Sequence, residues 1–279
     1  MARNAVTPLV AALLAIGGYG AVLGWLSWNE DAMVFPVDQR TRALVPPDPT
    51  FGLNPRRVEA VTADGVRLVG WVMADPEPAD SAVWMLVFHG NGENVSNVGR
   101  TEHYLHLRAL GLNVVAFDYR GYGESEGRPS EAGLYRDADA MWAFARDSLG
   151  IAANRIVLYG HSLGTAVAVE LASRTRPRAV VLEGAFTSLA DVGRRLYPFV
   201  PVRLLARNRF ASADVIGRVS SPLLFLHARG DNIVPPELGR ALYELAPEPK
   251  RFVELAGGHN DAYVADPAAY FDAIAGLLR

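Results

Sequence analysis

Residues 159–164 read Tyr159-Gly160-His161-Ser162-Leu163-Gly164, and they join an apolar, strand-like run to a stretch with helical spacing. One residue separates Ser162 from a glycine on each side, Gly160 and Gly164. A strand that turns directly into a helix has room only for glycine at these positions, and the sharp turn forces the serine hydroxyl outward. The helix N-terminus also favours negative charge. An ordinary turn with a capping serine is the alternative, but the strand–turn–helix context favours Ser162 as a nucleophile.

Strand-like and helix-like segments alternate around this motif. The expected strands are residues 57–62, 66–73, 82–88, 113–117, 155–159, 179–182, 223–226 and 252–255. The expected helices are residues 98–110, 163–174, 236–245 and 267–278, with one more that begins after Ser130 and carries apolar residues at helical spacing from Leu134 to Ala145. Such alternation predicts an α/β protein with a mostly parallel sheet and helices on both faces. The turn at residues 63–65 predicts an antiparallel hairpin at its start.

A neutral serine needs a general base, and the chain has six histidines to supply one. His259 follows two glycines in the loop after the last predicted strand, which is the expected place for the base. A surface loop histidine is the plainer alternative. His161 is expected to point away from Ser162 along the turn. Packing or surface roles suit the histidines on a predicted helix or at a strand end: His103, His106 and His227.

The acid that orients such a base is expected between the serine and the histidine in chain order. Asp231 lies there, in a loop directly after a predicted strand. Its carboxylate would fix the imidazole tautomer and stabilise the imidazolium. The surrounding Gly-Asp-Asn sequence is also a good turn, so a purely local role is the alternative. Asp214, Glu183 and Asp261 are weaker candidates for the same role.

A glycine-rich loop, His89-Gly90-Asn91-Gly92, follows the first buried strand. Such a loop can aim a backbone N–H at the carbonyl oxygen under attack. We predict an oxyanion hole made by the N–H groups of Asn91 and Leu163, the residue after the nucleophile. A plain glycine turn is the alternative. Residues 118–125, Asp-Tyr-Arg-Gly-Tyr-Gly-Glu-Ser, are expected to form a structural loop near the site, held by an internal ion pair.

Composition excludes several other functions. The chain has no cysteine, which removes thiolate catalysis, disulfides and Cys-ligated metals. A net charge of −3 gives no electrostatic basis for binding nucleic acid. We see no metal-ligand spacing and no phosphate-binding glycine loop, so we expect neither a metal nor a cofactor. Protein partners and the oligomeric state cannot be inferred from the sequence.

Residues 5–28 form a long apolar stretch, and about 20 apolar residues suffice to cross a bilayer. We therefore expect residues 1–28 to be a single-pass membrane anchor, with Trp25 and Trp28 at the membrane interface. The competing interpretation is a cleaved signal peptide, with its cleavage site near residues 18–20. The length of the apolar stretch favours the anchor.

The charges around this stretch indicate its orientation. Arg3 precedes it, whereas Glu30 and Asp31 follow it. The positive-inside rule then places the catalytic domain in the periplasm or outside the cell. The proline-rich residues 29–55 are expected to form an extended linker that wraps onto a catalytic domain at 56–279.

In combination and order, these motifs resemble the α/β-hydrolase superfamily: His89–Gly92, Asp118–Gly123, Gly160–Gly164, Gly230–Asp231 through Val234–Pro235, and Gly258–His259. The resemblance extends from about residue 57 to the end. Within this superfamily, the chain is similar to the lidless, N-terminally anchored branch that includes bacterial membrane hydrolases and, more distantly, protein depalmitoylases. It implies an eight-stranded, mostly parallel sheet without a large cap domain and an acyl-enzyme mechanism.

The resulting expectation is a serine hydrolase that cleaves carboxylic esters or thioesters of a small-molecule or lipid-like acyl substrate. A serine peptidase or amidase on the same triad is the first alternative, and a non-catalytic binding protein with this fold is the second. Only about 38 residues separate Glu183 from the strand near Pro222, too few for an independent cap, and part of them is expected to form a short helix around residues 188–197. We therefore expect an open site, with a groove lined by apolar side chains at Phe186, Leu189, Tyr197 and Phe199.

Overall fold

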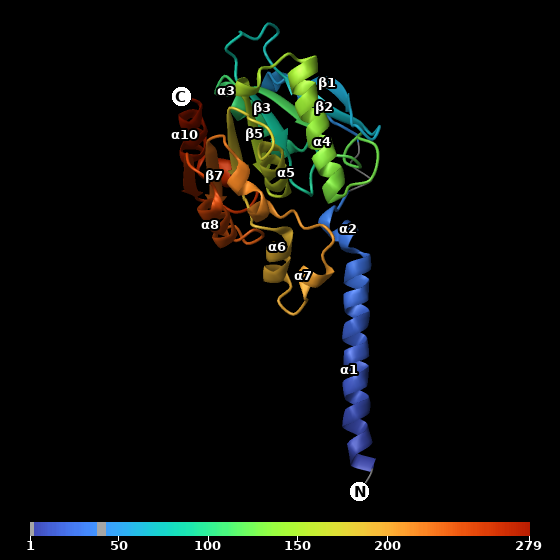
Figure 1. Cartoon of the computed structure of the whole chain (residues 1–279). Helices are drawn as coiled ribbons and strands as arrows, with labels where there is room; N and C mark the ends of the chain where they lie inside the picture. The colour runs from blue at the N-terminus through green and yellow to red at the C-terminus, as the bar shows by residue number, and fades with distance from the viewer. Residues whose placement is uncertain (1–2, 38–42) are drawn as a thin grey trace.

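The computed structural model describes residues 3–37 and 43–279 of the chain (Figure 1). One sheet contains the strands β1 Arg56–Val61, β2 Arg67–Met73, β3 Trp84–Phe88, β4 Asn113–Phe117, β5 Ile156–His161, β6 Ala179–Glu183, β7 Leu223–Ala228 and β8 Lys250–Leu255. The helices are α1 Arg3–Trp28, α2 Glu30–Val34, α3 Val98–Ala109, α4 Glu131–Ala143, α5 Leu163–Ala172, α6 Leu189–Leu196, α7 Val202–Leu205, α8 Pro236–Leu245, α9 Ala262–Ala265 and α10 Pro267–Leu278.

The strands lie in the order β1-β2-β4-β3-β5-β6-β7-β8. The pairs β1–β2 and β2–β4 are antiparallel, and every other pair is parallel. The predicted eight-stranded, mostly parallel sheet is therefore confirmed. All eight expected strands are present, with ends shifted by three residues or fewer, because a strand ends where its hydrogen bonding does rather than where its apolar run does.

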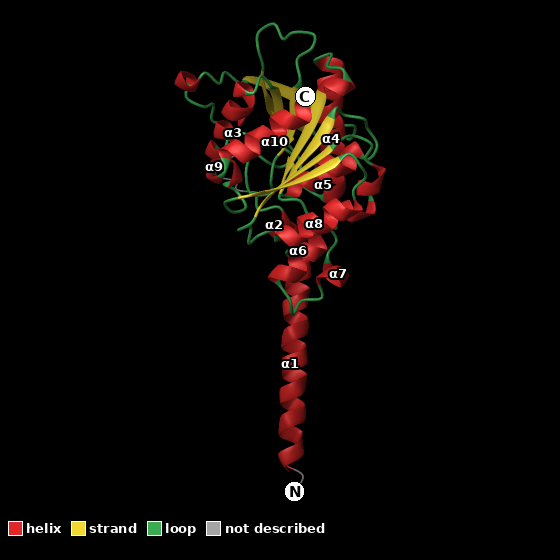
Figure 2. Ribbon diagram, turned by 90° about the vertical axis from the view of Figure 1, so that its left-hand side faces the viewer, coloured by secondary structure: helices red, strands yellow, loops and turns green. Residues whose placement is uncertain are grey.

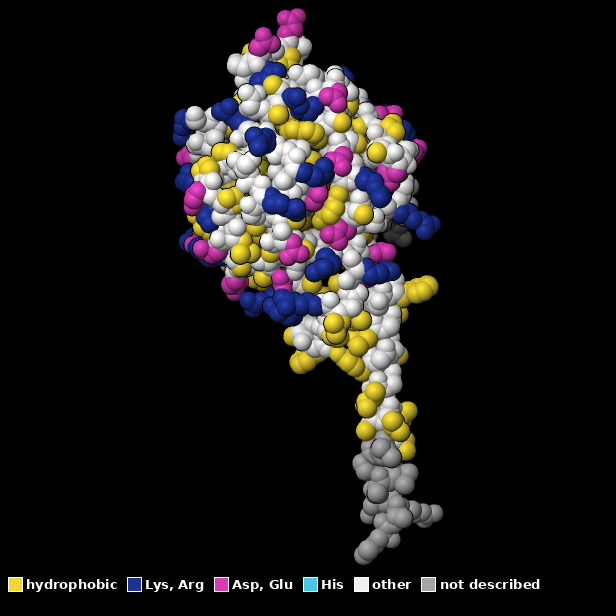
Figure 3. Space-filling view, viewed as in Figure 1, with side chains coloured by type: hydrophobic (Ala, Val, Ile, Leu, Met, Phe, Trp, Pro, Cys, Tyr) yellow, Lys and Arg dark blue, Asp and Glu magenta, His cyan; other side chains and the backbone are white. Residues whose placement is uncertain are grey.

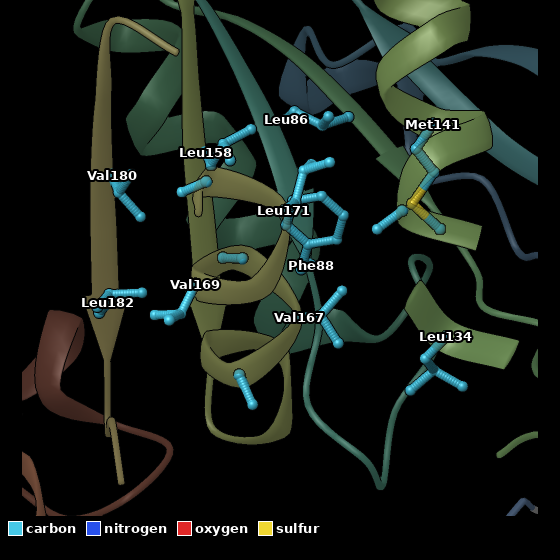
Figure 4. Close-up of a cluster of buried hydrophobic side chains, with 14 of the residues drawn as sticks. Leu86, Phe88, Leu134, Met141, Leu158, Val167, Val169, Leu171, Val180 and Leu182 are labelled. Carbon is cyan, nitrogen blue, oxygen red and sulfur yellow. The ribbon is translucent and has the colours of Figure 1, made fainter. Parts of the chain in front are cut away.

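Both faces of the sheet are covered by helices (Figure 2). Side chains alternate along each strand, so Leu86 and Phe88 face one hydrophobic core while Met85 and Val87 face the other. The first core contains residues of α4, α5 and α8, and Figure 4 shows part of it between the strands and α5. The second core contains residues of α3, α9 and α10. Burial on both faces explains why the parallel strands are continuously apolar in sequence.

Helix α1 projects away from the sheet and its helices (Figure 1). Its residues Val10–Trp28 have a mean hydropathy of 1.7 and are long enough to cross a membrane, and none of this window is buried in the protein. The same test is passed by signal sequences, so the helix is weak evidence for an anchor by itself.

The expected extended linker at 29–55 begins instead with a helix, α2. Pro36 is the first proline of this region, and residues 30–34 precede it far enough to stay helical. Phe35 and Leu53 are both buried against the domain, so this segment packs on it as expected. The division into an anchor at 1–28, a linker at 29–55 and a catalytic domain at 56–279 stays a prediction.

Between β6 and β7 the chain forms two short helices, α6 and α7, rather than a cap domain. Helix α6 corresponds to the expected helix around residues 188–197, and Ser188 caps it by accepting a hydrogen bond from the Asp191 N–H. Helix α7 was not predicted, since four residues give little periodicity. Both helices lie beside the end of α1 that joins the domain (Figure 1).

Candidate active site

Ser162 lies in the sharp turn between β5 and α5, with φ 51° and ψ −119°. A positive φ is strained for any residue except glycine, and such strain collects at functional sites. The Ser162 N–H donates to the Glu183 carbonyl oxygen at 2.8 Å, which fixes the turn against β6. A Cβ at Gly160 would collide with the carbonyl oxygen of Gly164, and one at Gly164 with that of Phe88. The two glycines are therefore required by backbone contact.

Ser162, His259 and Asp231 form one chain of hydrogen bonds. His259 Nε2 lies 2.8 Å from Ser162 Oγ, and His259 Nδ1 lies 2.7 Å from Asp231 Oδ2. Asp231 follows β7 and His259 follows β8, so the ends of three parallel strands bring together residues that are up to 97 positions apart. The arrangement fits a Ser-His-Asp relay, in which the acid orients the base and the base contacts the hydroxyl.

Asp231 is held as a carboxylate by its surroundings. Its Oδ1 accepts the N–H groups of Ile233 at 3.0 Å and Val234 at 2.8 Å. Burial alone would raise the pKa of Asp231, but hydrogen bonds from His227, His259 and the Val234 amide hold it well below its ordinary value. Since the ionised form is favoured, Asp231 can stabilise a positive charge on His259 without taking its proton.

The rival acids are engaged elsewhere. Glu183 is buried and accepts hydrogen bonds from the hydroxyls of Tyr159 and Tyr270, the latter at 2.7 Å. Asp261 accepts the N–H of Gly258 and so braces the loop that carries the base. Asp214 ends a short 3₁₀ turn, Ser212–Asp214. Only Asp231, of the four candidates, hydrogen-bonds to the imidazole of His259 in the described part of the chain.

The loop after β3 lies beside Ser162. Asn91, Leu163 and Ser162 line the same cavity. The Asn91 side chain donates to the Val34 carbonyl oxygen at 3.0 Å, and the backbone carbonyl oxygen of Asn91 accepts the Tyr122 hydroxyl at 3.0 Å. These two bonds hold in place the residue whose backbone N–H is predicted to bind an oxyanion. The assignment of Asn91 and Leu163 as donors stays a prediction.

A buried ionic network next to the relay was not predicted from the sequence. His161 Nε2 lies 3.0 Å from the His259 carbonyl oxygen, and its Nδ1 lies 3.4 Å from Glu93 Oε1. Glu93 also accepts the Gly90 N–H at 2.9 Å and the Arg100 Nε–H at 2.8 Å. The network thus connects the predicted oxyanion loop to the loop of the base. No sequence pattern marks Glu93 or Arg100, because the residues that they contact across the network, His161 and Tyr159, lie on β5.

Charge pairing stabilises this network. Burial would raise the pKa of Glu93, but Arg100 and His161 hold it well below its usual range. His161 does not simply point away from the site, since its ring centroid lies 5.1 Å from that of His259. His227, by contrast, is a buried histidine as predicted, with Nε2 2.9 Å from the Val234 carbonyl oxygen.

The loop at residues 118–125 is structural, but its predicted internal ion pair is wrong. Arg120 instead contacts Asp137 of α4 at 2.8 Å and Asp64 of the β1–β2 turn at 2.9 Å. Both partners are distant in sequence, so the charges within the loop suggested the wrong pairing. Asp118 is fully buried, accepts the Val95 N–H at 2.8 Å, and has its pKa raised by burial to about 8.

Two cavities meet at Ser162. One has a volume of about 250 Å³ and is mainly apolar, with Phe186, Leu189 and Tyr197 in its lining, as expected. Phe199 is not in that lining; it is 87% exposed, because the chain turns outward between α6 and α7. The second cavity, of about 310 Å³, has polar walls that include Glu93, Asn97 and His259.

The walls of the apolar cavity come from two separate parts of the chain. Part of its wall comes from the N-terminal region, with Leu26 of α1 and Met33 and Val34 of α2. The opposite wall comes from α6 and α7. The α6 wall was expected through Leu189, whereas the N-terminal wall was not, because the N-terminal residues were expected to form only an anchor and a linker. Among the described residues there is no cluster of three or more His, Asp or Glu side chains able to hold a metal ion.

The sequence matches known proteins along almost its whole length. A family model described as "Serine aminopeptidase, S33" matches residues 79–212. An uncharacterized protein of Mycobacterium tuberculosis is 38% identical over 270 residues, covering 96% of this chain and 94% of the relative. Protein bem46 of Schizosaccharomyces pombe is 32% identical and covers 92% and 88%. Lysophosphatidylserine lipase ABHD12 of Danio rerio is 36% identical over 198 residues, covering 64% of this chain and 50% of that protein.

Solved structures share the fold. An esterase of Pyrococcus furiosus superposes with a TM-score of 0.71 at 21% identity, covering 85% of this chain and 96% of the esterase. At that identity the likeness concerns the architecture alone. Together with the strand order, the strained serine turn and the relatives above, it leads to one conclusion: the chain belongs to the α/β-hydrolase superfamily, as a hydrolase of its lidless branch with an N-terminal helix.

Proposed function

We propose that the protein cleaves carboxylic ester or thioester bonds through an acyl-enzyme formed on Ser162. The observation that carries this proposal is the continuous hydrogen-bond chain from Asp231 through His259 to the Ser162 hydroxyl. The hydroxyl also borders two cavities of different polarity, which leaves room for both halves of an ester.

In the first half of the proposed reaction, His259 Nε2 accepts the proton of Ser162 as Oγ attacks the substrate carbonyl carbon. The negative charge that develops on the carbonyl oxygen is held by the N–H groups of Asn91 and Leu163. The tetrahedral intermediate collapses, the bond to the alcohol or thiol breaks, and the imidazolium returns its proton to that leaving group. Asp231 stabilises the imidazolium throughout.

In the second half, a water molecule takes the place of the leaving group. His259 accepts a proton from this water as its oxygen attacks the acyl-enzyme carbonyl. The second tetrahedral intermediate releases the carboxylic acid, and the proton returns to Ser162 Oγ. The cycle needs no cofactor.

The two cavities favour separate binding of the two halves of the substrate. The apolar cavity suits an acyl chain, because transfer of hydrocarbon from water to apolar walls is favourable. The polar cavity suits the leaving alcohol or thiol. The names of an esterase with this fold and of a lysophosphatidylserine lipase among the relatives agree with a lipid-like acyl substrate.

A peptidase or amidase is the second candidate, and the description of the matching family model favours it. The same relay can cleave an amide. A peptide terminus would need a free charged group in the site, yet the Asp, Glu and Arg residues that line the two cavities are already paired: Glu93 with Arg100, and Glu30 with Arg207. We therefore rank the ester function first. A binding protein without activity would not need the strained serine.

The test is a substrate panel with the full chain. We expect p-nitrophenyl esters of short to medium acyl chains, or an acyl thioester, to give a higher kcat/KM than aminoacyl anilides. Faster turnover of the anilides than of every ester would move the assignment to a peptidase. No turnover of any substrate, together with no labelling by a fluorophosphonate, would favour the binding protein.

We further propose that α1 anchors the enzyme in a membrane, with the catalytic domain on the extracytoplasmic side. The apolar length of α1 and the charges at its two ends support this orientation. Protease added to intact spheroplasts should remove the domain. Full protection would show the opposite orientation, and release of a soluble, shortened protein would show a cleaved signal peptide.

A further inference from the structure

The connection between β6 and β7 carries an exposed apolar tip that the proposed reaction does not use. Phe199 and Leu204 are 87% and 86% exposed, and Leu196 and Tyr197 beside them are also exposed. Neither Phe199 nor Leu204 lines the cavity at Ser162. Four large apolar side chains within nine residues are unusual on a water-exposed surface, and such a patch marks a contact with a lipid or another apolar partner.

The tip lies against α1, well inside its apolar length. The Tyr19 hydroxyl donates to the Phe199 carbonyl oxygen at 2.6 Å. Tyr19 precedes Trp25 by six residues, which is about 9 Å along a helix. If Trp25 marks the membrane interface, Phe199 lies at a depth typical of interfacial elements, which insert by about 5–10 Å.

Charged residues of the N-terminal region and of the β6–β7 connection lie where the membrane interface would be. Arg207, after α7, contacts Glu30, after α1, with Nε 3.0 Å from Oε2. Residues 189–209 contain five arginines and one acid, Asp191. Arg194, Arg203 and Arg207 have half or more of their side chains exposed. Figure 3 shows basic side chains bordering the apolar part of the domain next to α1. Arginine heads at this level can bind lipid phosphates while the tip enters the acyl chains.

We propose that residues 196–205 insert into the membrane leaflet that faces the catalytic domain, beside the C-terminal part of α1, and that the apolar cavity at Ser162 receives an acyl chain directly from that leaflet. The cavity lies between these two elements, since its walls include Leu26 and Met33 on one side and Leu196, Tyr197 and Leu205 on the other. The partner is a bilayer containing anionic lipid. This inference deepens the proposed function and rests on the proposed anchoring of α1.

Direct insertion is measured by lipid quenching. The chain contains no cysteine, so Phe199→Cys, Leu204→Cys, Val22→Cys and Ala79→Cys each provide one labelling site in the full-length protein. Each variant carries a fluorophore and is reconstituted in vesicles of zwitterionic and anionic lipid with quenchers on the acyl chains. Val22 lies in α1, and Ala79 is exposed in the loop between β2 and β3, far from α1 (Figure 1).

We expect quenching at residues 199, 204 and 22 and none at 79. Quenching at 22 but not at 199 and 204 would overturn the inference while leaving the anchor in place. Probes at 199 that are shielded from lipid but cross-link to a second copy would identify a dimer interface and would also overturn it. This readout does not depend on hydrolysis, so it stands even if the enzymatic proposal fails.

A second measurement tests acyl-chain delivery. Phe199→Glu combined with Leu204→Glu should lower hydrolysis of a long-chain ester embedded in vesicles by about tenfold or more, because a carboxylate is costly in the acyl region. Hydrolysis of a water-soluble acetate ester should stay unchanged, since neither side chain lines the cavity. Ala79→Glu is the matched control. An unchanged ratio of the two rates would contradict delivery from the leaflet.

Discussion

The two sides of Ser162 are built in different ways. On one side, the ends of β5, β7 and β8 place Ser162, Asp231 and His259 by backbone geometry and short hydrogen bonds. On the other side, α1, α2, α6 and α7 supply apolar walls that lie outside the sheet, although Val192 of α6 also belongs to the first core. Under the proposed function, the sheet edge would carry out the reaction, whereas the added helices would select the acyl group that reaches it. Substitutions on the two sides should have effects of different kinds.

The largest expected effect is on the sheet side. Ser162→Ala should abolish fluorophosphonate labelling and reduce kcat on the order of 10⁶-fold, equally for every acyl chain length, because the nucleophile is lost. Ser173→Ala, at the end of α5, is the matched control and should keep both. Labelling that persists in Ser162→Ala would place the nucleophile at another residue.

The next effect concerns the orienting acid. Asp231→Asn should lower kcat on the order of 10⁴-fold, since an amide at this position holds the wrong imidazole tautomer. Steady-state kinetics on a soluble ester would measure it. Asp214→Asn replaces a rival acid and should stay near wild type. A large loss in Asp214→Asn with a small loss in Asp231→Asn would reverse the assignment of the acid.

On the apolar side the effect should depend on the substrate. Val200 lines the apolar cavity, and Val200→Trp would fill part of it. We expect kcat/KM to fall about 10–100-fold for a medium-chain p-nitrophenyl ester but little for the acetate, since each lost methylene contact is worth about 1–3 kcal/mol. Val61→Trp, at an exposed position on β1, is the control. An equal loss for both esters would mean that the cavity does not hold the acyl chain.

The smallest expected effect is on stability, and it again concerns a residue at the end of a strand, Asp231. The pKa of Asp231 lies below its unfolded value of about 3.9, so its carboxylate stabilises the fold above that pH, and this contribution is lost as the pH falls through the folded value. The difference in Tm between wild type and Asp231→Asn should be constant above about pH 5 and should shrink below about pH 4. The corresponding loss in the free energy of unfolding is on the order of 1–3 kcal/mol.

Thermal unfolding followed by tryptophan fluorescence would measure this difference. Ser162→Ala keeps the carboxylate and should follow the pH dependence of the wild type. A difference that stays constant down to pH 3 would show that the hydrogen bonds to Asp231 do not favour its charged form.

Much of the fold and the relay could be predicted, since both follow from local sequence. Apolar runs and helical spacing indicate the strands and helices, and the glycines around Ser162 reflect backbone contacts within a few residues. Chain order then indicates His259 and Asp231, because parallel strands end at one edge of the sheet. The strand-like runs already numbered eight, and the resemblance to a known superfamily implied the same number.

What the sequence by itself determined is therefore the sheet, its helices and the three residues whose positions follow from strand ends. Only the tertiary structure decided the contacts between separate elements: the contact of Glu93 with His161, the pairing of Arg120 with Asp64 and Asp137, and the cavity between α1 and α6–α7. The physical reason is that secondary structure depends on neighbours a few residues away, whereas an ion pair or a cavity wall depends on how separate elements pack.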